Sequence, residues 1–192
     1  MISFSITLEE TTVDPALAGR SRDWWSQAVR NLKFAEESIN GEWHEWACFA
    51  AHQAAEMAVK ALYLHLGREL KGNVVSRLLN ELPGSTSVDE EVLESAKVLD
   101  TFYIPTQYPD SHALGAPYEH YGPLQSQGAI ACATRVLEFA QRAVDSGSVT
   151  NRRTLDGNKP GNSKLVLVFV KPQTYQAWLI LDQRLTTLSP GI

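Results

Sequence analysis

Apolar residues recur at every third or fourth position along most of the chain, which is the spacing of one face of an α-helix. In the longest of these segments most of the apolar positions are alanines, which favour helix formation and let a neighbouring helix approach closely. Side-chain caps are expected at Ser21 and at the capping box Ser87-x-x-Glu90. The predicted helices cover residues 21–40, 42–66, 74–82, 87–99 and 123–144.

The two ends of the chain do not follow this helical pattern. Residues 1–9 alternate between apolar and polar side chains, as a strand does, and residues 11–20 are expected to form a connector. Residues 164–170 are strong strand formers, which could pair with the N-terminal strand, exchange between subunits of a dimer, or belong to a tail foreign to the domain. The predicted division is a strand and connector over residues 1–20, a helical domain over 21–146 and an extension of undetermined fold over 147–192.

The segment from Phe102 to Gly122 differs from the rest of the helical domain. Its prolines and glycines exclude a regular element, yet it is rich in tyrosine. A loop of this length inside a compact domain is usually functional or packed by its own side chains. Its tyrosines could therefore stack on the bases of single-stranded RNA or pack the loop against the helices. The tyrosines concerned are Tyr108, Tyr118 and Tyr121.

Composition narrows the class of protein. Hydrophobic residues make up 44% of the chain and charged residues 20%, as in an ordinary globular protein. The formal net charge of -5 argues against a broad, charge-driven grip on duplex nucleic acid, although a local basic site is compatible with it. Cys48 and Cys132 are expected to be buried free thiols rather than a disulfide, and their spacing suits no metal site.

The N-terminal residues lack the basic and apolar regions of a signal peptide. Apolar stretches are much shorter than the roughly 20 residues that span a bilayer. We therefore expect no membrane association and a cytoplasmic protein, with no metal and no cofactor.

Three segments in this order resemble the HEPN family, whose name refers to higher eukaryotes, prokaryotes and nucleotide binding. They are the alanine-rich helix of residues 46–62, the segment of residues 102–110 and the segment of residues 115–121. The resemblance implies a mainly α fold, a four- to five-helix up-and-down bundle, to which the chain ends could add a small β element. It also implies a homodimer with a functional groove at its interface. Many members are metal-independent endoribonucleases with an Arg-x4-6-His motif. Many are toxins paired with a nucleotidyltransferase, and others bind nucleotides or RNA or act as scaffolds.

The chain departs from that motif. None of its five histidines follows an arginine at the required distance, and the nearest equivalent is Gln107-x4-His112. Cutting RNA without metal requires a base, an acid and a cation that stabilises charge on the phosphate. Histidine can serve as base or acid, but glutamine lacks the charge of arginine. Losing such a donor costs about 100- to 1000-fold in rate, so weak cleavage or none is expected.

The resemblance assigns His112 as the acid or base, with an ordinary exposed loop histidine as the open alternative, and Gln107 as a weak phosphate contact. Asp110 would either orient His112 or cap the turn after Pro109. His52 and Lys60 lie eight residues apart on the second predicted helix and so nearly on one face, which could contact nucleic acid or be an ordinary solvated or interface face.

Two functional hypotheses remain. The first is a protein that binds RNA or nucleotides, with or without weak endoribonuclease activity of the toxin–antitoxin type. The second is a non-catalytic module that dimerises and holds a protein partner such as a nucleotidyltransferase.

Overall fold

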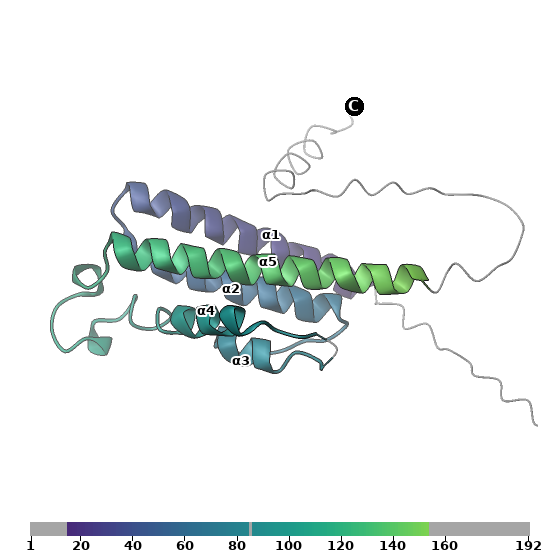
Figure 1. Cartoon of the computed structure of the whole chain (residues 1–192). Helices are drawn as coiled ribbons and strands as arrows, with labels where there is room; N and C mark the ends of the chain where they lie inside the picture. The colour runs from purple at the N-terminus through teal and green to yellow at the C-terminus, as the bar shows by residue number, and fades with distance from the viewer. Residues whose placement is uncertain (1–14, 85, 154–192) are drawn as a thin grey trace, which may run out of the picture. The chain divides into compact units, whose positions relative to one another are not determined.

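The computed structural model describes residues 15–84 and 86–153, and within these the side chains of residues 16–146 except residue 18. The strand predicted near the N-terminus and most of the predicted C-terminal extension lie outside the described residues. Within the described part the protein is mainly helical, as predicted, with five α-helices and two short 3-10 helices (Figure 1). These are α1 (Pro15–Asn40), α2 (His44–His65), α3 (Val75–Asn80), α4 (Glu90–Asp100), η1 (Pro109–Ser111), η2 (Pro117–Glu119) and α5 (Pro123–Arg153).

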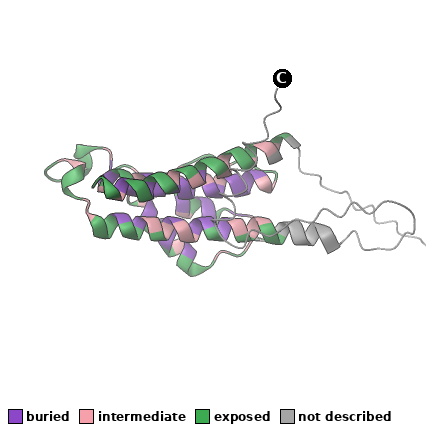
Figure 2. Ribbon diagram, turned by 90° about the horizontal axis from the view of Figure 1, so that it is seen from above, coloured by how far each residue is buried: buried purple, intermediate pink, exposed green. Residues whose placement is uncertain are grey.

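Helix α2 is the centre of the bundle, because it contacts each of the other four α-helices. Helices α1, α2 and α5 run side by side, and the shorter α3 and α4 lie along α2 (Figure 1). The alanine stripe predicted for α2 is buried, so its neighbours can approach closely. Buried residues line the inward sides of the helices, and the loop before α5 is largely exposed (Figure 2). The buried alanines of α2 are Ala47, Ala50, Ala51, Ala54, Ala55, Ala58 and Ala61.

Two expectations about helix starts were wrong. Helix α1 begins at Pro15, because proline is well suited to the first position of a helix. The end of the predicted connector is therefore helical. Ser21 consequently lies inside α1, where its hydroxyl donates to the carbonyl oxygen of Ala61 at 2.8 Å and ties α1 to α2. Helix α4 begins after Asp89 without a side-chain cap, so the capping box predicted from Ser87 does not form.

Helix α3 is fixed to the end of α4 by one carboxylate. Oδ1 of Asp100 accepts a hydrogen bond from the backbone N–H of Val75 at 2.6 Å. Its Oδ2 accepts from the backbone N–H and the hydroxyl of Ser76, at 3.1 and 2.5 Å. The first N–H groups of a helix have no partner within the helix, so a carboxylate from another helix satisfies them and favours the helix dipole.

Both cysteines are free thiols, as predicted. Cys48 is fully buried, and burial raises the pKa of its thiol to about 12. Cys132 is only half-buried. None of the helices in the described part of the chain is long and apolar enough to cross a membrane.

Candidate functional site

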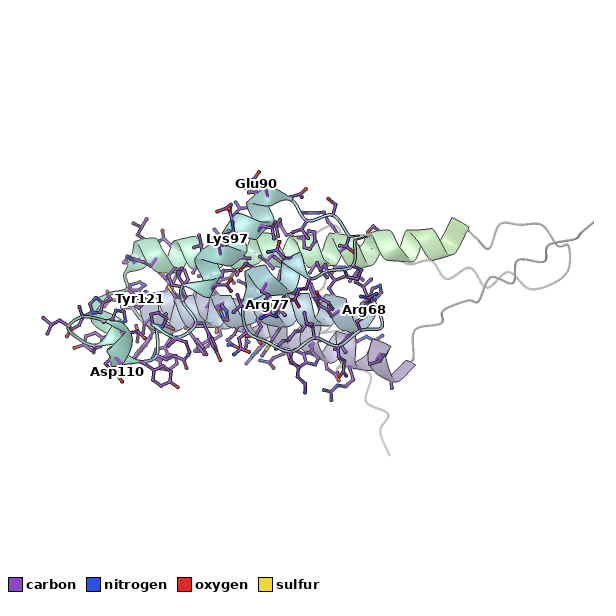
Figure 3. All side chains as sticks on the ribbon, turned by 90° about the horizontal axis from the view of Figure 1, so that it is seen from below. Arg68, Arg77, Glu90, Lys97, Asp110 and Tyr121 are labelled. Atoms are coloured by element: carbon purple, nitrogen blue, oxygen red, sulfur yellow. The ribbon has the colours of Figure 1, made fainter. Side chains whose placement is uncertain are left out.

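The loop between α4 and α5, residues 101–122, lies at one end of the bundle. Figure 3 shows Asp110 and Tyr121 of this loop at one end, with Arg68 toward the other. The loop starts as a series of turns in which the buried hydroxyl of Thr106 donates to the carbonyl oxygen of Phe102 at 2.6 Å. Its two 3-10 helices each begin with a proline. Local turns and proline therefore give the loop a defined shape without a regular element.

Two histidines of this loop stack face to face. The ring centroids of His112 and His120 are 4.0 Å apart, and the ring planes differ by 4°. The Nε2 atom of His112 lies 2.7 Å from the carbonyl oxygen of Pro105, and that of His120 lies 2.7 Å from the carbonyl oxygen of Leu114. A carbonyl oxygen only accepts, so both Nε2 atoms carry hydrogen. In the neutral rings both Nδ1 atoms are then available to accept a proton or a hydrogen bond.

A glycine makes this stacking feasible. Gly115 has a φ of 84°, a left-handed conformation that residues with a side chain rarely adopt. A Cβ atom built there would also collide with the carboxylate of Glu119 and lie 3.3 Å from Nε2 of His120. The turn at Gly115 thus permits the chain to return and place His120 on His112.

His120 is a candidate site residue that the sequence analysis did not propose. It lies in one of the three segments that resemble the family, directly before Tyr121. A second histidine in the same glycine-containing loop was the available signal. The stacking itself depends on the path of the loop, which the sequence pattern does not specify.

Gln107 and Asp110 are near His112 in sequence, but neither side chain contacts the His112 ring by a hydrogen bond among the described residues. The side-chain amide of Gln107 donates to the carbonyl oxygen of Tyr103 at 2.6 Å. Asp110 is exposed in η1 and, among the described residues, has no hydrogen bond or ion pair with His112. The carbonyl oxygen of Pro105, rather than Asp110, holds the His112 ring in this structure.

The three candidate tyrosines differ in exposure. Tyr108 is 55% exposed and Tyr118 is 65% exposed, so both have ring surface available to a ligand. Tyr121 is half-buried and packs edge-on against Phe102 and His112, each at 6.0 Å between ring centroids. Burial raises the pKa of Tyr121. The two roles considered for the tyrosines are thus divided, with Tyr121 packing the loop and Tyr108 and Tyr118 free to stack.

His52 is placed in the core rather than in the site. Its side chain is fully buried, and Nε2 donates to the carbonyl oxygen of Asn73 at 2.9 Å. Burial lowers the pKa of His52, which keeps the ring neutral, so the carboxylate of Asp100 at 3.9 Å is not a partner in an ion pair. The His52 ring stacks on the ring of Tyr103, with 5.0 Å between the ring centroids. The Tyr103 hydroxyl in turn accepts a hydrogen bond from the side-chain amide of Asn73 at 2.6 Å. A buried neutral imidazole cannot touch RNA in this conformation, but it supports the start of the loop.

Lys60 also lies away from the histidine pair. Its Nζ forms an ion pair with Glu56 at 2.7 Å and lies 5.4 Å from the centre of the Trp24 ring on α1. The structure thus groups the tyrosines, His112 and His120 in one loop, but not His52 or Lys60. Among the described residues, no group of three or more histidine, cysteine or acidic side chains could hold a metal ion.

This arrangement defines a class of helical-bundle proteins with an aromatic, histidine-bearing loop before the last helix. The HEPN domain family matches residues 21–143, so the chain belongs to the HEPN family. The fold is similar to that of TT1696 from Thermus thermophilus, with 44% sequence identity and a TM-score of 0.64 over 65% of this chain and 98% of that chain. It is also similar to ST0689, an archaeal HEPN homologue, with 37% identity and a TM-score of 0.55 over 65% of this chain and 97% of that one. No curated protein sequence matches the chain significantly.

Proposed function

We propose that this protein binds single-stranded RNA through the loop of residues 101–122 and works as a cytoplasmic homodimer. The observation that carries the proposal is the stacked pair of His112 and His120 in the same loop as the exposed Tyr108 and Tyr118. Exposed aromatic rings stack on unpaired bases, and this stacking contributes about 1–3 kcal/mol per base. The Nδ1 atoms of the two histidines can bond to phosphate or to base edges. Together these groups suit a flexible, unpaired strand better than a duplex.

Charge in the loop argues against fast cleavage. Residues 101–122 contain no lysine or arginine, whereas Asp110 and Glu119 are acidic. Gln107 replaces the arginine of the family motif, and its amide is already bonded to a backbone carbonyl. This loop therefore supplies no cation to stabilise the negative charge that develops on a phosphate. Such stabilisation is usually a large contribution to catalysis.

Any residual cleavage would proceed without metal. The 2'-hydroxyl would lose its proton to Nδ1 of His112 and attack phosphorus, the P–O5' bond would break, and the departing oxygen would take a proton from an acid. In-line attack requires the base and the acid on opposite sides of the phosphate. His112 and His120 of one protomer are stacked at 4.0 Å and so lie together. The acid is therefore best supplied by the second protomer.

A binding experiment tests the proposal. Fluorescence anisotropy with a labelled single-stranded RNA should show binding that weakens by about 5- to 150-fold in Tyr118→Ala, given the usual strength of base stacking. Phe34→Ala is the matched control, because Phe34 is a 53% exposed aromatic residue on α1, outside the loop. Equal affinities for the wild type and Tyr118→Ala, with Tyr108→Ala also unchanged, would contradict the proposal.

A second comparison separates binding from catalysis. In the presence of a chelator, cleavage of single-stranded RNA should be slow in the wild type, absent in His112→Ala and faster in Gln107→Arg. Binding without cleavage by any of these variants would leave an RNA-binding domain that is not a nuclease.

A second candidate function is a module that holds a protein partner, such as the nucleotidyltransferase of a toxin–antitoxin pair. Leu114, between η1 and η2, is 85% exposed, and Leu124 at the start of α5 is 82% exposed. Exposed apolar side chains mark an interaction surface where they form a contiguous patch. Failure of the wild type to bind RNA would favour this candidate.

A further inference from the structure

A pocket distinct from the histidine loop is built from three parts of the bundle. It has a volume of about 280 Å³. One wall comes from α1, one from the second half of α2, and one from the segment that joins α2 to α3. Figure 3 shows Arg68, in that joining segment, away from Asp110 and Tyr121. The lining residues are Arg20, Trp24, Lys60, Leu64, Glu69, Leu70, Lys71 and Gly72.

Positive charge dominates the lining. Arg20, Lys60 and Lys71 come from different elements and converge on one hollow, against the single acid Glu69. Lys60 is already paired with Glu56 at 2.7 Å. Arg20 and Lys71 are exposed and have no ion pair within the described part of the chain, so both are available to an anion.

The joining segment also offers backbone donors. Among the described residues, the N–H groups of residues 69–73 donate no hydrogen bond, whereas the N–H of Arg68 before them donates to Tyr63 at 2.9 Å. Gly72, which lines the pocket, has a φ of 128° and nothing within 4 Å of the position of a Cβ atom. Free backbone N–H groups next to cationic side chains are a common anion-binding arrangement.

The rest of the lining is apolar. Trp24, Leu64 and Leu70 provide an aromatic and aliphatic wall next to the cations. A ligand that matches both parts has a multiply charged group with several oxygens, attached to a less polar body. The volume is just below the roughly 300–1,000 Å³ of drug-sized ligand pockets, so it would accommodate one phosphate with part of its substituent.

We propose that this pocket binds a phosphate monoester, of the kind carried by a nucleoside 5'-monophosphate or by the 5' end of an RNA strand. This inference does not depend on the proposed function, because no residue of the pocket belongs to the loop of residues 101–122. Lysine and arginine supply charged donors to the phosphate oxygens, and the less polar part of the ligand lies against the apolar wall.

Isothermal titration calorimetry on the full chain tests this, with inorganic phosphate, a nucleoside 5'-monophosphate, and matched RNA strands with a 5'-phosphate or a 5'-hydroxyl. We expect binding that weakens by about tenfold or more in Lys71→Gln and in Arg20→Gln, since each removes a charged hydrogen bond. Arg30→Gln is the control, because Arg30 is exposed on α1 and does not line the pocket.

The ligands distinguish the source of the phosphate. Tight binding of the free nucleotide indicates a nucleotide site, and binding only of the 5'-phosphorylated strand indicates a site for RNA ends. No preference for phosphorylated over unphosphorylated ligands would overturn the proposal, as would equal losses in Lys71→Gln and Arg30→Gln. Lys60 is less suitable for substitution, because its loss would leave the carboxylate of Glu56, which is only 6% exposed, without its partner.

Discussion

Replacement of Asp100 by asparagine tests whether the link between α4 and α3 stabilises the bundle. In Asp100→Asn, one oxygen can still accept from the N–H of Val75. The other oxygen is replaced by an NH2 group, so that two hydrogen-bond donors, this group and the backbone N–H of Ser76, lie opposite each other. The serine hydroxyl can turn to accept, but the backbone N–H cannot. The substitution thus removes a negative charge from the start of α3 and leaves a backbone donor without a partner.

The expected loss can be worked out from these contacts. A hydrogen bond to a charged group contributes about 1.5–3 kcal/mol, and an unsatisfied donor adds a cost of about 1–3 kcal/mol when it is fully buried. The Asp100 side chain is 17% exposed, so water can offset part of that cost. We expect the free energy of unfolding to fall by about 2–4 kcal/mol.

Urea unfolding followed by circular dichroism measures this change. With a slope of about 2 kcal/mol per M, the midpoint should fall by about 1–2 M urea. Asp89→Asn is the control, because Asp89 precedes α4 and makes no side-chain capping bond. Its effect should stay below about 0.5 kcal/mol, as for other surface changes. A similar small shift in both variants would show that Asp100 does not stabilise the start of α3.

Three further changes are expected. Burial lowers the pKa of His52 below its value of 6.5 in the unfolded chain. The stability that comes from burying the neutral ring is therefore complete above pH 6.5 and is lost as the pH falls below 6.5. We therefore expect the free energy of unfolding, measured with urea between about pH 7.5 and 5, to depend less steeply on pH in His52→Gln than in the wild type. The difference should be at most about 1.4 kcal/mol per pH unit. Because the pKa of Cys48 is raised to about 12, an alkylating reagent should label the half-buried Cys132 first, as mass spectrometry of the peptides would show. Faster labelling of Cys48 would contradict its burial. Gly115→Ala should lower the free energy of unfolding by about 1–3 kcal/mol, measured by urea unfolding, and an unchanged midpoint would argue against the left-handed turn.

Much of the bundle could be predicted because its signals are local. The alanine stripe of α2 and the apolar spacing of α5 indicate helices from residues three or four positions apart. The prolines and glycines of residues 102–122 likewise excluded a long element there. Helix starts were less predictable, because Ser21 and Ser87 are residue types that often cap helices, yet in the structure Ser21 lies inside α1 and α4 begins after Asp89 without a side-chain cap.

The site itself was only half predictable. His112 was proposed as a site residue from the family resemblance and its place five residues after Gln107, whereas its contact with His120 depends on a turn at Gly115. His52 was placed on a candidate binding face because helical spacing tells which residues share a face, and not which face is buried. The contact that decides its place joins α2 to Asn73, 21 residues later. The role of Asp100 was missed for the same reason, because its partners lie 24 and 25 residues earlier.

Crosslinking tests most directly whether the loop of residues 101–122 is the RNA surface. A single-stranded RNA that contains 4-thiouridine would be irradiated with the full chain, and the attached peptides identified by mass spectrometry. We expect attachment within residues 101–122, at or next to Tyr108 or Tyr118, and loss of that attachment when both are replaced by alanine. Attachment confined to the outer faces of α1 and α5, unchanged by these substitutions, would contradict it.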